Sequence, residues 1–292
     1  MQLNRRGFTL AELLVAMVLL GIVSAALYRV LVNNQRVYTA QTQRIAMQQN
    51  IRAAGNILPA EFRELDAAEN DIKAMSATSL TIRAQRWLGI ACIPPVMGGA
   101  LGGLTATVMG GTPGTPLFYG SRAPIANSDS VLVYYDGNAT TRTDDAWMRG
   151  NLTANVVGAC PGGGAGRVLT FTLANTQPNF AGAIPAGAPI RGYEVVTYSL
   201  YRPAGDTSWY VGYAPQGQAP QPLIGPIMPN GLQFTYFDSL GVATATPARV
   251  ARIDIVVMAR TEQQVRAGGS NQQRTLVDTV FTSVALRNNK RF

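Results

Sequence analysis

The chain has 292 residues and no histidine, which excludes Ser-His-Asp and Cys-His catalysis and any zinc site that needs imidazole. Its 24 Lys and Arg residues outnumber its 16 Asp and Glu residues, so its formal net charge is +8. A chain of this length can bury the core of one sizeable domain, or of one domain with large insertions.

The chain begins with a short charged segment followed by an apolar one. Arg5 and Arg6 precede a run of about twenty mostly apolar residues, the pattern of a membrane-targeting segment. No acidic residue accompanies the two arginines, so the positive-inside rule keeps them in the cytoplasm and predicts export of the rest. Glu12 interrupts the apolar run, where a carboxylate usually faces a partner. A cut between Gly7 and Phe8 would place a new cation one helical turn before Glu12, which suits assembly.

Residues 6–16 (Arg-Gly-Phe-Thr-Leu-Ala-Glu-Leu-Leu-Val-Ala) resemble the class III signal of type IV prepilins and pseudopilins. The resemblance implies that a prepilin peptidase cuts between Gly7 and Phe8, and that the new amine of Phe8 is methylated. It also implies that Glu12 neutralises the amine of a neighbouring subunit during polymerisation. From the residues alone, a plain signal anchor, or a secretory signal cut near residues 24–26, is the alternative.

Helix-forming residues continue beyond the apolar run, although the polarity changes from Tyr28 onward. No proline occurs before Pro59, so residues 8–58 are predicted to form one helix of about 75 Å. Its part 8–31 is predicted to span the membrane, and the remainder to pack on a globular head. Gly55 and Pro59 are the predicted helix breakers.

The remainder, residues 59–292, is predicted to be a β-rich head that follows a cleaved leader, 1–7, and the helix. Short links between the later strands favour antiparallel pairing. The fold class is therefore α+β, and the resemblance implies a pilin fold: a long N-terminal helix packed on an antiparallel sheet with long Gly/Pro-rich loops. The predicted strands are 79–85, 130–135, 167–173, 193–202, 208–214, 232–238, 249–259 and 274–286.

Two segments, 94–128 and 136–166, are rich in Gly, Pro, Asn and Thr and are predicted to be flexible surface loops. Glycines 162–166 invite comparison with a phosphate-binding loop. They are followed by Arg167 and a strand, however, and not by Lys-Ser/Thr and a helix, so a nucleotide site is not favoured.

The later strands carry a second resemblance. Residues 230–238, 251–257 and 285–288 resemble the head of the PilW-like minor pilins, and J-type pseudopilins of type II secretion share parts of this pattern. The length of the chain fits the PilW-like proteins better.

Cys92 and Cys160 are the only cysteines. In an oxidising periplasm they are predicted to form a disulfide, which closes a loop of about seventy residues and stabilises the fold by roughly 4 kcal/mol. A catalytic or metal-binding thiol is the alternative, but the chain offers neither a histidine nor a third cysteine to assist it.

No enzyme activity, cofactor or metal site is predicted. Most of the candidate carboxylates stand at predicted turns, where aspartate bends the backbone. Asp254 interrupts an apolar strand two residues after Arg252, which predicts a structural ion pair. The carboxylates available for a glycosidase pair are Asp136, Asp144, Asp145, Glu194, Asp206, Asp238 and Asp254.

The basic residues give weak support for DNA as a partner. Arginine suits phosphate contacts, but the arginines are spread over the head. The only dense group is Arg287, Lys290 and Arg291 at the C-terminal end. A solvated basic surface is therefore the preferred interpretation.

Together these features predict a minor type IV pilin. Its expected partners are other pilins, major and minor, which it meets through the N-terminal helix, the prepilin peptidase and the inner-membrane assembly platform. Its expected location is the inner membrane, in a single pass with a periplasmic head, and then the pilus at the cell surface. The resemblance leaves roles in pilus assembly, adhesion, twitching or DNA uptake open. A J-type pseudopilin is the first alternative, and a membrane-anchored binding module or enzyme the second.

Overall fold

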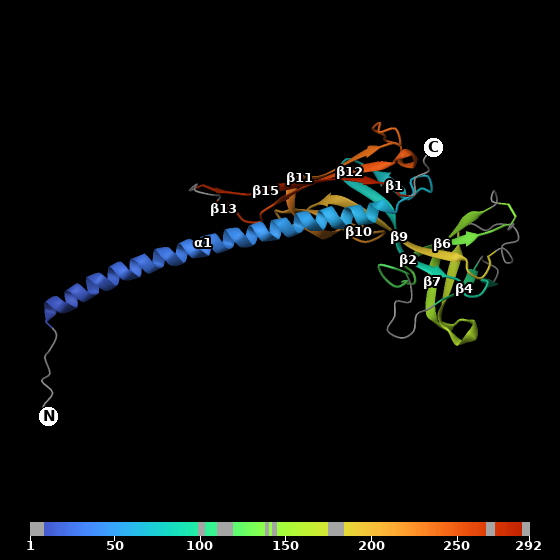
Figure 1. Ribbon diagram of the computed structural model, residues 1–292, viewed down its shortest axis with the longest axis horizontal. Coiled ribbons are helices and arrows are strands. Elements are labelled where there is room, and N and C mark those ends of the chain that lie inside the picture. Colours follow the sequence, from blue (N-terminus) through green and yellow to red (C-terminus); the bar gives the residue numbers. More distant parts are fainter. Residues whose placement is uncertain are drawn as a thin grey trace, which may run out of the picture.

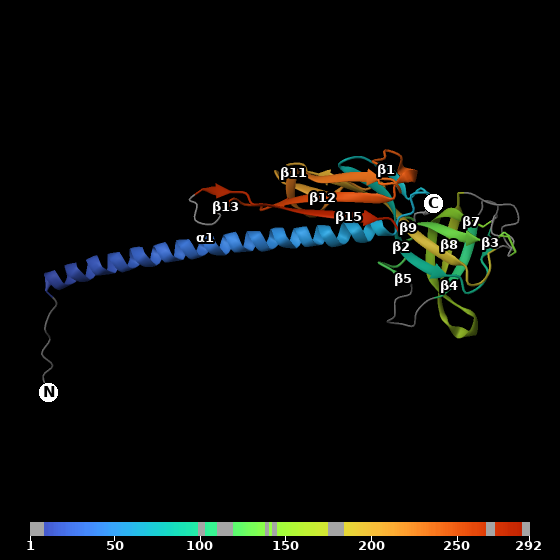
Figure 2. The ribbon, with the colours of Figure 1, turned by 45° about the horizontal axis from the view of Figure 1, so that its top comes forward.

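One long helix, α1 (Leu10–Arg63), extends far out of a β-rich head (Figure 1). The second half of α1 lies along the sheet in both views, and its first half projects away from the head (Figure 2). The computed structural model describes residues 9–98, 103–109, 119–137, 140–141, 145–174, 184–266 and 272–287.

Helix α1 is longer than the sequence predicts. Neither Gly55 nor Pro59 ends it, and the helix continues to Arg63. A proline inside a helix costs about 3 kcal/mol because one backbone hydrogen bond is lost and the ring meets the preceding turn. Leu58 and Phe62 on either side of Pro59 are both 0% exposed, so the packing of this turn on the sheet outweighs the local preference.

The strands that the structure describes pair antiparallel throughout, as predicted. They are β1 (Ile72–Met75), β2 (Ser79–Ile90), β3 (Val96–Gly98), β4 (Gly103–Met109), β5 (Tyr119–Gly120), β6 (Ser130–Tyr135), β7 (Ala146–Ala159), β8 (Ala165–Leu173), β9 (Pro189–Tyr201), β10 (Trp209–Pro215), β11 (Gln221–Phe237), β12 (Arg252–Arg260), β13 (Val265–Arg266), β14 (Gln273–Arg274) and β15 (Val277–Ala285). The main sheet has the order β15-β12-β11-β10-β9-β6-β7-β8-β4-β3, and β2 joins it beside β9. Strands β13 and β14 form a separate hairpin.

The sheet encloses two hydrophobic cores. In the stem lobe (β1, β10, β11, β12 and β15), Ala54, Leu58 and Phe62 of α1 pack against the strands. In the distal lobe (β3, β4, β6, β7 and β8), the core forms around Trp87 and Phe171 without α1. Strands β2 and β9 are long enough to contribute to both cores, so they hold the two lobes together.

The two predicted loops are wrong in part. The segment 94–128 contains β3, β4 and β5, and the segment 136–166 contains all of β7 and the first residues of β8. Two glycines of β7 lie where a neighbouring strand approaches closely: a Cβ on Gly150 would lie 2.8 Å from the Thr172 carbonyl oxygen, and one on Gly158 2.6 Å from Val168 Cγ2. At these two positions glycine permits close packing between strands and does not indicate a loop.

Trp87 marks the point where β2 passes from one core to the other. Its indole is fully buried, and Nε1–H donates to Asp129 Oδ2 at 2.9 Å. Gly192 of β9 lies directly opposite Trp87 in the ladder. A Cβ on Gly192 would lie 1.8 Å from Trp87 Cε2, so only glycine leaves room for the indole.

We expect Gly192→Ala to lower the free energy of unfolding by about 3 kcal/mol, because the added methyl displaces a buried indole from its hydrogen bond. Thermal unfolding of the full-length chain in detergent, followed by tryptophan fluorescence, measures this loss. Gly164→Ala is the control, since its Cβ would meet only Cys160 Cβ at 3.7 Å. Equal stability of the two variants would contradict the packing assigned to Trp87.

Candidate functional site: the N-terminal helix and its anchorage

The first turn of α1 is closed by a capping box between Thr9 and Glu12. The Glu12 backbone N–H donates to Thr9 Oγ1 at 3.3 Å, while Glu12 Oε2 accepts from the Thr9 backbone N–H at 2.9 Å and from Thr9 Oγ1–H at 3.0 Å. These bonds use Oε2, and Oε1 has no partner among the residues that the structure describes. The spacing Thr-x-x-Glu is the sequence signal for this cap.

The predicted cleavage junction and leader charges, Gly7, Phe8, Arg5 and Arg6, lie outside the described residues. The roles assigned to them remain predictions. Glu12 and its cap are the nearest part of the site that the structure describes.

The first half of α1 exposes its apolar side chains on every face. Leu10 is 82% exposed and Val15 59% exposed, and the other large apolar side chains up to Leu31 are exposed as well. This is the one helix in the described chain that is long and apolar enough to cross a membrane. Because such a surface is costly in water, it supports membrane anchoring through the N-terminus.

The second half of α1 is held to the head by packing and by hydrogen bonds. The Phe62 ring meets the rings of Tyr198 and Phe234 edge-to-face, with centroids 5.5 and 6.0 Å apart. Asn50 Nδ2–H donates to the Gly225 carbonyl at 2.7 Å. Nearer the membrane part, Gln43 Oε1 accepts from a backbone N–H of the segment that leads into β13.

A charge network fixes the end of α1 where the two lobes meet. Both oxygens of Glu61 accept from Arg86 Nη1 at 2.9 Å, and Arg86 Nε–H donates to Glu194 Oε2 at 3.1 Å. Burial lowers the pKa of the Arg86 guanidinium, but the carboxylates of Glu61 and Glu194 outweigh it, so this pKa lies above its ordinary value. Glu194 also accepts from Tyr213 Oη–H at 3.1 Å. Helix, β2 and β9 are therefore joined by one set of paired charges.

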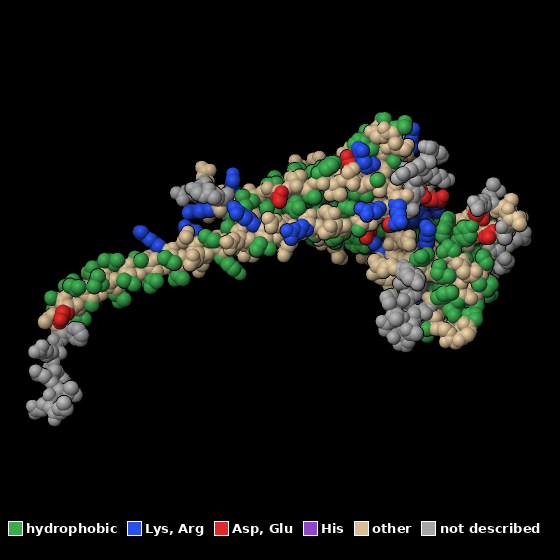
Figure 3. All heavy atoms as spheres, in the orientation of Figure 1, with side chains coloured by type: hydrophobic (Ala, Val, Ile, Leu, Met, Phe, Trp, Pro, Cys, Tyr) green, Lys and Arg blue, Asp and Glu red, His purple; other side chains and the backbone are tan. Residues whose placement is uncertain are grey.

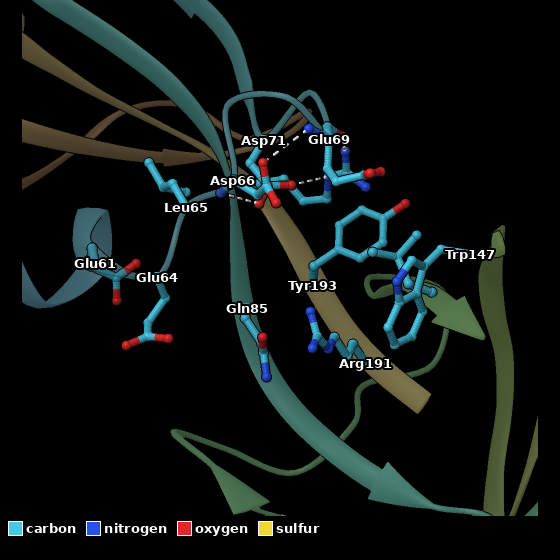
Figure 4. A pocket seen from close by; sticks show the side chains of 12 residues that line it. Glu61, Glu64, Leu65, Asp66, Glu69, Asp71, Gln85, Trp147, Arg191 and Tyr193 are labelled. Carbon is cyan, nitrogen blue, oxygen red and sulfur yellow. Dashed lines mark hydrogen bonds and ion pairs between the residues drawn. The ribbon is translucent and has the colours of Figure 1, made fainter. Parts of the chain in front are cut away.

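A cavity of about 310 Å³ opens beside this network, between the end of α1 and the distal lobe (Figure 4). Two of its acidic side chains serve local structure: Asp66 Oδ1 accepts from the backbone N–H groups of Ala68 and Glu69, and Asp71 pairs with Arg83 at 3.0 Å. Burial raises the pKa of the Asp71 carboxyl, and its bond to the Asp66 N–H and the Arg83 charge only partly oppose this shift.

Arginine side chains cover the aromatic rings that line this cavity. The Arg191 guanidinium lies 4.6 Å from the Trp147 ring centroid, and the Arg83 guanidinium 4.9 Å from that of Tyr193. Within the described residues, no three Asp, Glu or Cys side chains form a group that could hold a metal. These contacts make the cavity part of the junction between the two lobes.

The candidate carboxylates are dispersed. Glu194 belongs to the charge network, Asp206 and Asp238 accept from backbone N–H groups of their own turns, and Asp144 lies outside the described residues. The predicted ion pair of Asp254 with Arg252 is confirmed, with Oδ1 and Nε 3.2 Å apart.

Cys92 and Cys160 are joined by a disulfide in the distal lobe, with their Cα atoms 5.7 Å apart. Cys160 follows β7 at its turn into β8, and Cys92 follows β2 and donates its backbone N–H to the Thr107 carbonyl of β4. The bond therefore ties the outer hairpin of the distal lobe to the strand that the lobes share.

We expect Cys92→Ser with Cys160→Ser to cost about 4 kcal/mol, mainly in the distal lobe, because the bond closes a loop between residues 68 positions apart. Hydrogen exchange followed by mass spectrometry measures this, since amides of β4, β7 and β8 should exchange faster while those of β12 and β15 change little. Uniform acceleration in both lobes would contradict a local role.

Comparison with known proteins gives one match. A family model described as the prokaryotic N-terminal methylation motif matches residues 2–28. Searches of curated proteins and of solved structures returned no match.

The matched residues include the predicted cleavage junction, Glu12 with its cap, and much of the exposed apolar part of α1. The layout of one long N-terminal helix and a large antiparallel sheet is consistent with a pilin-like protein. The motif and this helix together support a prepilin-type precursor, a type IV pilin or pseudopilin, that is anchored in the membrane through its N-terminus.

Proposed function

We propose that this chain is a minor type IV pilin of the PilW-like kind, cut between Gly7 and Phe8 and methylated on the amine of Phe8. The observation that carries the proposal is the exposed apolar half of α1, which holds Glu12 as its one acidic residue and coincides with the methylation motif. Its role is docking, with no catalytic step.

The exposed apolar half of α1, which we call the stem, would leave the membrane for the core of a fibre. Leu10, Leu13, Leu14 and Val15 are all more than half exposed and would be buried between neighbouring stems. The membrane already keeps these side chains out of water, so the gain in the fibre would come from close packing between neighbouring stems. Glu12 would meet the methylated amine of a neighbour, which compensates a carboxylate removed from water.

The partners follow from this mechanism. The prepilin peptidase acts on the leader, the inner-membrane assembly platform extracts the subunit, and other pilins, major and minor, surround the stem. The head would lie in the periplasm at first and on the pilus surface afterwards. DNA is a less favoured ligand, because part of the arginine content of the head is used in internal ion pairs such as those of Arg83 and Arg86.

Sheared surface fibres, searched by mass spectrometry for the peptide that begins at methylated Phe8, provide the direct test. Finding this peptide in fibres supports cleavage, methylation and incorporation together. The processed form confined to membranes, with loss of protein secretion on deletion, would instead indicate a J-type pseudopilin. An intact Met1 end in the mature protein would overturn the pilin assignment.

Replacement of Gly7 by a bulky residue is expected to block processing, because a large side chain beside the scissile bond would not enter a peptidase site that accepts glycine. The mass of the membrane-bound chain measures this directly. Gly21→Ala is the matched control, since Gly21 lies on the exposed stem with no atom within 4 Å of its added Cβ. Efficient cleavage of Gly7→Trp would contradict the peptidase assignment.

A further inference from the structure

A groove lies between the stem and the β13–β14 hairpin, at the point where the apolar part of α1 ends. The hairpin is held against the helix because Gln43 Oε1 accepts from the backbone N–H groups of Glu262 and Gln263 at 3.0 and 3.3 Å, and because Val265 is buried. The groove has a volume of about 350 Å³ and is lined by arginine, glutamine, threonine and valine side chains. Arg36 and Arg266 stand on its two sides.

The side chains that line this groove include two arginines and no acidic residue, although Glu262 lies just before the hairpin. Segments 28–44, 263–266 and 272–274 contain no Asp or Glu. Their arginines are exposed and form no ion pair within the part of the chain that the structure describes. Figure 3 shows basic side chains where the apolar stem reaches the head. These arginines are Arg29, Arg36, Arg44, Arg266 and Arg274.

These charges oppose the usual distribution around a membrane helix. The positive-inside rule accounts for Arg5 and Arg6 before the apolar run, but it disfavours a second basic cluster after it. A cluster on this side therefore needs another explanation, and a negatively charged surface next to it would provide one.

The end of the groove nearer the membrane lies at the depth of the headgroup layer. A hydrocarbon core of about 30 Å takes up about twenty helical residues, which from Phe8 reach Leu27 or Tyr28. Val32 and Arg36, which line the groove, then lie roughly 6 and 12 Å beyond the edge of the core. The polar layer on each side of a bilayer is about 5–8 Å thick, and an arginine side chain can reach back into it.

We propose that this groove binds the phosphate of an anionic phospholipid in the leaflet next to the head. Arg36 and Arg266 offer guanidinium groups that can pair with phosphate oxygens from two sides, and the glutamine side chains add N–H donors. The bound headgroup fixes the head above the membrane until the subunit is extracted. The inference rests on membrane anchoring of the stem and holds for either a pilus or a secretion pseudopilus.

Lipid retention by the full-length chain in nonionic detergent tests the proposal. The protein is mixed with equal amounts of phosphatidylglycerol and phosphatidylcholine, and native mass spectrometry counts the lipids that remain bound. Wild type is expected to retain phosphatidylglycerol preferentially. Arg36→Gln with Arg266→Gln should reduce this retention about tenfold or more, and lysine at both positions should restore most of it.

The control is Arg52→Gln with Arg249→Gln, which removes the same charge from exposed positions away from the groove. It should retain lipid as wild type does, with all variants showing the same circular dichroism spectrum. Equal loss in both double variants, or no preference in wild type, would overturn the proposal. Displacement of the lipid by an equal concentration of inorganic phosphate would overturn the assignment to a lipid headgroup.

Discussion

Glu12→Gln is expected to leave cleavage between Gly7 and Phe8 intact and to reduce incorporation into fibres by about a hundredfold or more. The glutamine amide oxygen can still accept from Thr9, so the capping box seen in the structure survives the change. The negative charge does not survive. If the carboxylate neutralises the amine of a neighbouring Phe8 in the apolar fibre core, that cation is left buried and unpaired.

Two companion variants separate charge from capping. Thr9→Ala removes the side chain that bonds Glu12 but keeps the carboxylate, and should assemble nearly as wild type. Glu12→Ala removes the negative charge and the side-chain half of the capping box, and should fail like Glu12→Gln. The measurement is the amount of processed chain in sheared fibres relative to membranes. If Glu12→Gln assembles normally while Glu12→Ala and Thr9→Ala fail, the residue serves to start the helix and the charge-pair mechanism is wrong.

Local patterns predicted much of the sheet. Strand β6 (Ser130–Tyr135) coincides with the predicted range, because Val131, Val133 and Tyr135 alternate with less buried residues and all point into one core. The apolar part of α1 and its continuation were equally visible, since a long run of helix formers without proline needs no tertiary information.

The misses concern residues whose role depends on distant neighbours. Strand β7 was predicted as a loop because it contains Gly150 and Gly158. These positions need glycine because Thr172 and Val168 of the neighbouring strand leave no room for a side chain. Pro59 was predicted to end the helix, and it does not because Leu58 and Phe62 are held in a core built by later strands.

The residues of the candidate site also differ in whether a local pattern predicts them. Gly7, Phe8 and Glu12 are recognisable because their spacing is a short local motif, and Thr9 could have been added from the capping-box pattern. Arg86 could not be recognised. Its partners Glu61 and Glu194 lie 25 and 108 residues away in the sequence, and nothing local to any of the three predicts their meeting.

Arg86→Leu is therefore the substitution in the head from which we expect a large loss of stability, about 3 kcal/mol. The side chain is only 8% exposed, and its removal leaves Glu61 without the cation that bonds both of its oxygens. Glu194 keeps Arg122 at 3.6 Å, which limits the loss. Since Glu61 stands on the last turns of α1, the end of the helix should loosen from β2 before either core unfolds. Thermal unfolding and hydrogen exchange of the full-length chain measure the two effects.

Arg287→Leu is the matched control, because Arg287 pairs with Glu64 at the same end of α1, 3.5 Å apart, with side chains 72% and 51% exposed. Exposed pairs of this kind contribute under about 1 kcal/mol, since water screens both charges. Adding Glu61→Gln to Arg86→Leu should recover part of the lost stability, because the stranded charge is then removed. If Arg86→Leu costs no more than Arg287→Leu, the paired charges do not hold the stem to the head. That task then falls to Leu58, Phe62 and the rings around them.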